Sequence, residues 1–401
     1  MTSLSEIVHC SGHFPFACVL AANEAPERKF DICAGFSLSA ERAETGFPSF
    51  PRTHQFLFGH LSYDLKNHVE KLHSAYTDRI GFPGYGFFAP AYFFRASGDD
   101  IVSPGEDFFK AYSAKQNSPR EKFPREKIRH RTTKEKYISD VTKLKEHIRR
   151  GDIYEINYCI EFFAENVAID PPSLFLRLNE ISRAPFSALY RWKNAWLVCA
   201  SPERFLEKTG DRILSQPIKG TRPRGKNEKE DAGLAEELLN DPKERSENVM
   251  IVDLVRNDLS KIAARGSVKV DELFGIYSFP NVHQMISTVS ANVAEGKSTE
   301  DILRATFPMG SMTGAPKIRA MQLAEESENM RRGLYSGSVG YFTPEGDFDL
   351  NVVIRSIQWN AATGYLSFMT GSAITANCDP EKEYEECLLK AQTLLRALGA
   401  D

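Results

Sequence analysis

The stretch AWLVCASPERFLEKTGDRILSQPIKGTRP, residues 195–223, decides the fold class of this 401-residue chain. The apolar runs in 195–208 and 212–223 are bounded by turn residues, which predicts β-strands. Directly after them, 228–241 and 242–258 have the composition and the apolar spacing of helices. Strands followed by helices and then by further strands, rather than a strict strand–helix alternation, predict an α+β fold with large antiparallel sheets.

The same kinds of pattern continue on both sides of this stretch. Residues 153–163 (IYEINYCIEFF) alternate as a strand. A helix is predicted before them, because Tyr137, Val141 and Leu144 recur at helical spacing and Gly151 follows its last basic turn. Residues 381–399 close the chain as an amphipathic helix.

The N-terminal quarter has a different composition. Up to about residue 95 it is rich in Phe, Gly and Pro, with short runs typical of strands separated by turns. We expect 1–115 to form a β-rich region that contributes to the same sandwich. From Lys115 to Lys136 the chain carries nine Lys or Arg against three Glu. We interpret 116–136 as a solvated basic connector; the alternative is a docking patch for an acidic partner.

Composition argues against several classes of protein. Lys and Arg number 50 and Asp and Glu 54, a net charge of −4, whereas nucleic-acid-binding domains are normally strongly basic. The longest clean apolar run, 16–22, is far shorter than the roughly 18 residues that span a membrane. The first ten residues lack a basic segment followed by an apolar one, so we expect no secretory signal. The seven cysteines include no CxxC pair. We expect a cytoplasmic protein with no nucleic-acid or membrane partner.

Two predicted helices each carry a Glu-x-x-Glu pair, Glu244 with Glu247 and Glu383 with Glu386. This spacing places both carboxylates of a pair on one helical face. If the two faces meet, four carboxylates converge, and a hard divalent cation such as Mg²⁺ would offset their repulsion and leave positions for an anionic substrate. Taken singly, each pair is more often a solvated helix face, and the spacing does not show that the faces meet.

Two further residues have the setting of reactive groups. Lys219 ends an apolar strand beside a glycine and precedes Arg222 and Arg224, so desolvation and neighbouring cations would lower its pKa toward a nucleophilic amine. The alternative is a strand-end lysine that points to water. Glu203 follows an apolar strand, where burial would raise its pKa for general acid work.

Three polar residues could complete a pocket around these groups. The guanidinium of Arg355 offers a planar fork for a carboxylate, and Tyr335 and His283 could lie beside it. A lone histidine is more often a structural residue than a catalytic one.

Taken together, SPERF, PIKGTRPRG, KERSENVMIVDLVRNDL, FPMGSMTGAPKIRAM, GLYSGSVGYF and GSAITANCDPEKEYEE resemble, in order, the motifs of the chorismate-utilising enzymes. This family includes aminodeoxychorismate synthase component I, anthranilate synthase component I, isochorismate synthase and salicylate synthase. The resemblance implies the anthranilate-synthase-like fold, with two large packed antiparallel β-sheets, helices outside and the site between the sheets. It also implies that 137–401 form one interwoven chorismate-binding catalytic region.

The resemblance assigns roles by motif match. It implies that Glu247 and Glu386 bind Mg²⁺, supported by Glu244 and Glu383. Glu203 matches the general acid that assists departure of the ring 4-hydroxyl. The other matched positions are the catalytic-pocket residue His283 and the substrate-binding residues Tyr335, Arg355, Gly371, Ser372, Ser311 and Thr313.

Lys219 decides which branch of the family is closest. In the aminodeoxychorismate branch the lysine of PIKGT is implicated in covalent addition to ring carbon 2, whereas anthranilate synthases typically carry alanine there. We therefore expect an aminodeoxychorismate synthase component I that aminates chorismate at ring carbon 4, on the route to 4-aminobenzoate and folate. A separate glutamine amidotransferase subunit would supply ammonia. The alternatives are anthranilate synthase component I and a catalytically inactive regulatory relative.

Glu155, in YEINY, matches neither of the two residues that the family usually has at this position. Isochorismate and salicylate synthases have a lysine at the matching position to activate water, and amine-using members generally have glutamine there. The role of Glu155 is therefore open at this point.

Overall fold

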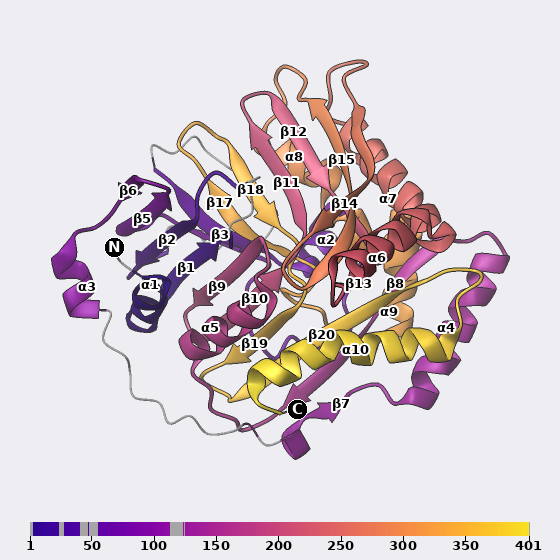
Figure 1. Cartoon of the computed structure of the whole chain (residues 1–401), viewed down its shortest axis with the longest axis horizontal. Helices are drawn as coiled ribbons and strands as arrows, with labels where there is room; N and C mark the ends of the chain where they lie inside the picture. Colours follow the sequence, from indigo (N-terminus) through magenta and orange to yellow (C-terminus); the bar gives the residue numbers. More distant parts are fainter. Residues whose placement is uncertain are drawn as a thin grey trace.

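Two antiparallel β-sheets form the body of the chain (Figure 1). The structure is a computed structural model, and it describes residues 3–23, 28–40, 47, 55–112, 123 and 125–400. The first sheet has 11 strands and the second has 9. Helices lie outside the sheets. The predicted α+β class with two large packed antiparallel sheets is therefore confirmed.

The first sheet contains, in spatial order, β16 (Gly314–Ala315), β8 (Glu155–Ala164), β20 (Tyr365–Ile374), β19 (Ser356–Asn360), β10 (Ala195–Ser201), β9 (Phe186–Trp192), β1 (Phe16–Ala21), β2 (Ile32–Ser37), β5 (Tyr92–Ser97) and β6 (Asp100–Val102), and β7 (Arg129–His130) pairs with β8. The second contains β13 (Ile218–Pro223), β15 (Val282–Asn292), β12 (Arg212–Gln216), β11 (Arg204–Thr209), β18 (Phe348–Asn351), β17 (Ser338–Phe342), β3 (Leu57–Leu61) and β4 (Tyr85–Phe88), and β14 (Lys269–Ser278) pairs with β15.

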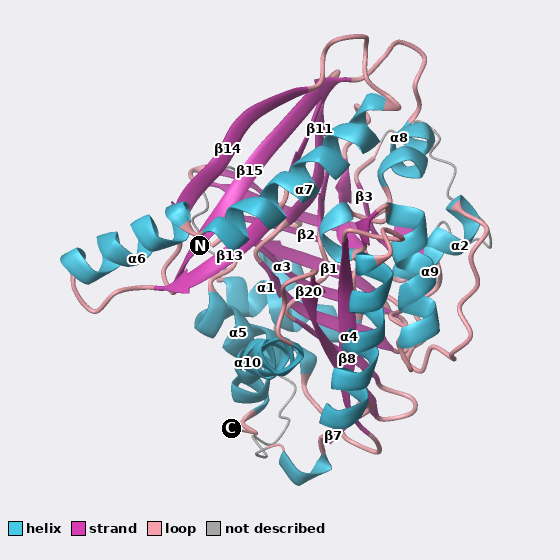
Figure 2. Cartoon of the chain, turned by 90° about the vertical axis from the view of Figure 1, so that its right-hand side faces the viewer, coloured by secondary structure: helices cyan, strands magenta, loops and turns pink. Residues whose placement is uncertain are grey.

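The α-helices are α1 (Leu4–Cys10), α2 (Lys66–Val69), α3 (Glu106–Tyr112), α4 (Lys134–Arg149), α5 (Pro171–Ser182), α6 (Glu228–Asn240), α7 (Pro242–Ser260), α8 (Thr299–Thr306), α9 (Lys317–Ser327) and α10 (Pro380–Leu398). Figure 2 shows α7 lying along β14 and β15, while α5 and α10 pack beside the other sheet. Within the described residues, no helix combines the length and the apolar character needed to cross a membrane.

The stretch 195–208 forms two strands rather than one, which is a correction to the sequence prediction. β10 belongs to the first sheet and β11 to the second, and the break falls at Pro202 and Glu203. Proline has no N–H to donate to a ladder, so a strand does not continue through it. Pro217 likewise interrupts the segment 212–223, but β12 and β13 on either side of it both belong to the second sheet. The chain therefore crosses between the sheets at Glu203, which places this residue beside the space between them.

The N-terminal strands are divided between both sheets. β1, β2, β5 and β6 lie in the first sheet, and β3 and β4 lie in the second. Residues 116–122 and 124 of the expected connector lie outside the described residues. Its remainder includes the short strand β7 and the first turn of α4, so this part is not simply a solvated linker.

The sheets pack through a buried aromatic cluster that includes Phe58, Phe88, Tyr190 and Trp192. They approach so closely at Gly86 of β4 that a Cβ there would lie 2.7 Å from the Trp192 ring of β9. Close packing of this kind leaves no room for an added methyl group.

Gly86→Ala should therefore lower the free energy of unfolding by about 1–3 kcal/mol, the usual cost of overpacking a core. Gly84→Ala is the matched control, because no atom lies within 4 Å of its added Cβ, and it should change stability by less than about 1 kcal/mol. Chemical denaturation of both variants measures the difference. Equal stabilities would contradict the tight contact between the sheets at Gly86.

Candidate active site

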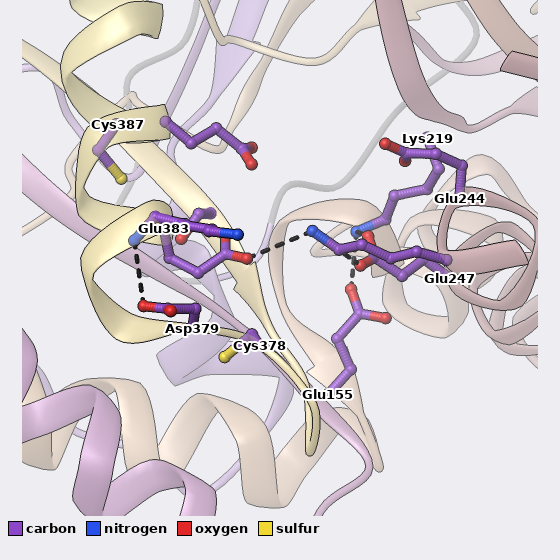
Figure 3. A network of polar contacts seen from close by, with 12 residues as sticks. Glu155, Lys219, Glu244, Glu247, Cys378, Asp379, Glu383 and Cys387 are labelled. Atoms are coloured by element: carbon purple, nitrogen blue, oxygen red, sulfur yellow. Dashed lines mark hydrogen bonds and ion pairs between the residues drawn. The ribbon is translucent and has the colours of Figure 1, made fainter. Parts of the chain in front are cut away.

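A buried lysine and a buried glutamate join the two sheets at the centre of the candidate site. Lys219 lies on β13 of the second sheet, and its Nζ donates a hydrogen bond to Oε1 of Glu155, 2.7 Å away on β8 of the first sheet. Oε2 of Glu247 on α7 lies 3.9 Å from the same Nζ (Figure 3). Strands from both sheets and the helix α7 therefore meet at the Lys219 amine.

The predicted lowering of the Lys219 pKa is wrong for this arrangement. Burial does act to lower the pKa of Lys219, but the negative charges of Glu155 and Glu247 outweigh it, and the net direction is upward. The cations next to it in sequence do not act as expected, because Arg222 is ion-paired with Glu237 and Asp241. Lys219 is therefore held as an ammonium.

The two Glu-x-x-Glu faces point toward each other, a question that the sequence alone did not answer. Asp241 caps α7 and Asp379 caps α10, each followed by proline at the first helical position, and these caps set where both helices begin. Nζ of Lys243 lies 3.3 Å from Oε1 of Glu383 and 3.8 Å from Oε1 of Glu247, and so links the two helices (Figure 3).

These carboxylates have the chemistry of a Mg²⁺ site. Oε1 of Glu247 is buried without a hydrogen-bond partner, and burial raises the pKa of Glu247 to about 7, with the Glu155 charge acting in the same direction. A cation would satisfy that oxygen and favour the ionised form. As they stand, no three His, Cys, Asp or Glu side chains of the described residues group closely enough to hold a metal ion. Lys243, whose side chain is half-exposed, lies between them and would have to move aside.

The fourth carboxylate, Glu386, is paired on its own helix. Its Oε1 lies 2.6 Å from Nζ of Lys390. Burial acts to raise the pKa of Glu386, but Lys390 and then Lys243 outweigh it, so the net direction is downward. Lys390 also donates to the carbonyl of Gly371 at 2.8 Å, and Oγ of neighbouring Ser372 lies 2.7 Å from the Tyr137 hydroxyl. Lys390 thus links the end of β20 to α10, and Tyr137 links it to α4.

Glu203 has the environment that its position predicts. It is 5 % exposed, and burial raises its pKa to about 7. The nearby positive charge of Lys219 acts in the opposite direction. The predicted rise in the Glu203 pKa is confirmed, and Glu203 is placed near both Lys219 and Ser311.

Arg355 and Tyr335 lie near the α10 end of this group. Burial lowers the pKa of Arg355, while the negative charge of Glu386 acts against that shift. Arg355 has a φ of 51°, a strained conformation for a residue with a side chain and one that clusters at functional sites. Thr313 is tied to its own loop, since its hydroxyl donates to the carbonyl of Met309 at 3.3 Å.

The structure places His283 in a different setting from the pocket predicted for it. Its Nε2 lies 2.9 Å from Oδ1 of Asp231 on α6, and its Nδ1 lies 2.8 Å from Oγ of Ser278 on β14. In the part of the chain that the structure describes, His283 forms no hydrogen bond or ion pair with Glu203 or Lys219. Its contacts join β15 to α6 and β14, so we do not retain it among the catalytic residues.

A buried ion pair between Arg332 and Glu328, which the sequence did not predict, holds the GSMTGAP loop against β8. Nη2 of Arg332 lies 2.6 Å from Oε1 of Glu328 and donates to the carbonyl of Asn157 on β8 at 2.9 Å. Nη1 of the same arginine donates to the carbonyl of Met312 at 2.7 Å. The one available signal was the four-residue spacing of the two charges, which an ordinary exposed pair shares.

Comparisons with known proteins agree with this geometry. Residues 17–396 match the family model described as chorismate binding enzyme. Anthranilate synthase component 1 of Thermus thermophilus is 36% identical over 367 residues, covering 88% of this chain and 79% of that protein. Aminodeoxychorismate synthase component 1 is 41% identical over 266 residues in Escherichia coli and 39% over 267 in Bacillus subtilis. Each match covers 66% of this chain but only 58% and 56% of those proteins.

Solved structures show the same fold. Anthranilate synthase component I from Streptococcus pneumoniae superposes with a TM-score of 0.73 and 25% identity, covering 89% of this chain and 82% of that one. MenF, the menaquinone-specific isochorismate synthase from Escherichia coli, superposes with a TM-score of 0.79 at 15% identity, covering 99% and 91%. At that identity the second match concerns the fold alone.

The Glu203 pKa makes stability depend on pH. Its ordinary value is 4.5 and its folded value about 7, so the folded chain binds this proton more tightly than the unfolded chain does. The resulting stabilisation is present below the ordinary value and is lost as the pH rises through 7. Relative to the neutral, isosteric Glu203→Gln, the wild type should lose up to about 3 kcal/mol of unfolding free energy between about pH 4.5 and pH 8. Denaturant titrations across this range test it, and a constant difference between the two proteins would contradict the buried, protonated Glu203.

Proposed function

The chain belongs to the chorismate-binding enzyme family, and we propose that it is an aminodeoxychorismate synthase component I. In this proposal ammonia replaces the ring 4-hydroxyl of chorismate to give 4-amino-4-deoxychorismate, on the route to 4-aminobenzoate and folate. The observation that carries the choice of carbon 4 is Lys219. It is a buried amine between the two sheets, close to the protonatable Glu203 and to the carboxylates of α7.

The reaction proceeds as two allylic displacements, which divide one difficult substitution into two. Lys219 is held as an ammonium, so it first gives one proton to Oε1 of Glu155, 2.7 Å away. Its Nζ then bonds to ring carbon 2 as the double bonds shift and the bond from carbon 4 to its hydroxyl breaks. The leaving hydroxyl takes the proton of Glu203 and departs as water.

Ammonia completes the exchange. It bonds to carbon 4, the double bonds shift back, and the bond between carbon 2 and Nζ breaks, so that Lys219 leaves as an amine and recovers its proton from Glu155. The new amino group carries one proton too many and gives it to the Glu203 carboxylate. Both carboxyl groups then return to their starting states.

Binding of the substrate is divided between two charged regions. Mg²⁺ held by Glu247 and Glu386, with Glu244 and Glu383 in support, would neutralise one carboxylate of chorismate. The Arg355 guanidinium, with Tyr335, suits the other carboxylate. Gly371, Ser372, Ser311 and Thr313 line the remaining walls in this proposal.

Ammonia comes from a partner in this proposal. The relatives from Escherichia coli and Bacillus subtilis are named as component 1 of aminodeoxychorismate synthase, which supports a glutamine amidotransferase subunit as the second component. No part of the chemistry above requires glutamine itself to reach the site.

Anthranilate synthase component I is the second candidate. It is favoured by the Thermus thermophilus relative, whose match covers 88% of this chain. That enzyme type would aminate carbon 2 and eliminate pyruvate from the same substrate. A catalytically inactive regulatory relative would form no product.

Incubating the purified chain with chorismate, Mg²⁺ and an ammonium salt separates these candidates by product. We expect 4-amino-4-deoxychorismate, which a separate lyase converts to 4-aminobenzoate. Fluorescent anthranilate formed without a lyase would contradict the proposal in favour of the second candidate. The absence of any product would favour the inactive relative.

Lys219→Ala should reduce amination at carbon 4 by roughly 100-fold or more, because it removes a group that takes part in the reaction. The matched control is Lys226→Ala, which removes an exposed lysine beyond the end of the same strand and should leave the rate unchanged. Initial rates with saturating ammonium measure both variants. Unchanged amination by Lys219→Ala would refute the covalent role of this lysine.

A further inference from the structure

Lys219 has two carboxylates within reach, and they have different roles in the proposed function. Oε1 of Glu155 accepts its hydrogen bond at 2.7 Å, while Oε2 of Glu247 lies 3.9 Å from the same nitrogen. The Lys219 side chain is 10 % exposed, and both carboxylates are more deeply buried. The ammonium is therefore nearer to Glu155, although Glu247 is close enough to compete for it.

The backbone of Glu155 is well fixed. This residue begins β8, where it pairs with Ala315 of β16, and the Tyr154 N–H donates to the Ala315 carbonyl at 2.6 Å. Gly314 packs so tightly there that a Cβ would lie 2.2 Å from the Glu155 carbonyl oxygen. Oε2 of Glu155 is buried and has no hydrogen-bond partner among the described residues. The carboxylate is thus a buried charge on a rigid strand end, and Lys219 balances it.

Lysine is the mobile member of this group. Its four-carbon stem lets the ammonium move between neighbouring acceptors, whereas Glu155 stands on a strand and Glu247 on a capped helix. If the Glu155 charge were absent, Glu247 would be the remaining anion in contact with the ammonium. An ion pair at Glu247 would occupy a carboxylate that the proposed function gives to Mg²⁺.

We propose that Glu155, besides taking the Lys219 proton in the proposed reaction, holds the resting Lys219 ammonium on the β8 side of the site and away from Glu247. Lys219 then remains available to the substrate while the Glu247 carboxylate remains available to Mg²⁺. The inference rests on the proposed function for the roles of Lys219 and Glu247. The Glu155 charge thus decides how the Lys219 ammonium is shared between Glu155 and Glu247.

Mg²⁺ affinity, measured by calorimetry on the full chain without chorismate, tests this positioning. Glu155→Ala should weaken Mg²⁺ binding by about tenfold, because the freed ammonium moves to Glu247. Lys219→Met should not weaken it. The double variant should bind Mg²⁺ within about threefold of Lys219→Met, since Lys219 is absent from both and Lys243 is unchanged in both.

Glu161→Ala is the matched control. Glu161 is another buried carboxylate of β8, paired with Arg131 rather than with Lys219, and its loss should leave Mg²⁺ affinity unchanged. Where Glu155→Ala fails to fold, Glu155→Gln takes its place, because the amide oxygen keeps an acceptor without the charge. It should weaken binding by about threefold, and Lys219→Met should again reverse the loss.

Two results would overturn the proposal. One is unchanged Mg²⁺ affinity in Glu155→Ala. The other is a double variant that binds as weakly as Glu155→Ala alone, which would mean that Glu155 acts on the metal directly. A wild-type chain that binds no Mg²⁺ would contradict the proposed metal site and this inference together. Anthranilate as product, with the expected binding pattern intact, would contradict only the assigned reaction.

Discussion

The buried ion pair between Lys219 and Glu155 is the interaction on which the arrangement of the site depends. It joins β13 of the second sheet to β8 of the first, across the space where the two sheets face each other. Removing two charges from water is costly. Deleting one partner of a buried ion pair leaves the other charge unpaired and typically lowers the free energy of unfolding by about 3–5 kcal/mol. The pair is stable because each member has the other, and Glu247 adds a second negative charge beside the ammonium. Changing any one of the three alters the surroundings of the other two.

The helices that bring the remaining charges follow one local design. α7 and α10 each begin with an aspartate cap followed by proline, and each carries its Glu-x-x-Glu pair within the first two turns. Negative side chains are favoured there by the exposed N–H groups and the positive end of the helix dipole. This design directs four carboxylates toward one region, where Lys243 and Lys390 offset part of their repulsion. The donor set suits a hard cation, which supports the magnesium requirement that we propose.

Much of this arrangement could be predicted from the sequence, because the relevant signals are local. Helical spacing predicted the two glutamate pairs, and the apolar strand before Glu203 predicted its burial and raised pKa. The failures concern partners distant in the chain. The pKa of Lys219 depends on Glu155, 64 residues earlier, and on Glu247 of another helix, which no local pattern reveals. His283 contacts Asp231 of α6, 52 residues earlier, which is also beyond the reach of a local pattern. The segment predicted as one strand over 195–208 is divided between the two sheets as β10 and β11.

The proposed chemistry depends on a covalent bond between Lys219 and ring carbon 2, and the mass of the intact protein reveals that bond when chorismate is present without ammonia. With chorismate and Mg²⁺ present but no ammonium, the intact protein should gain the mass of chorismate less one water, and peptide mapping should locate that gain at Lys219. Addition of ammonium should then discharge the adduct as 4-amino-4-deoxychorismate. An unmodified protein that nevertheless aminates carbon 4 once ammonium is added would contradict the account.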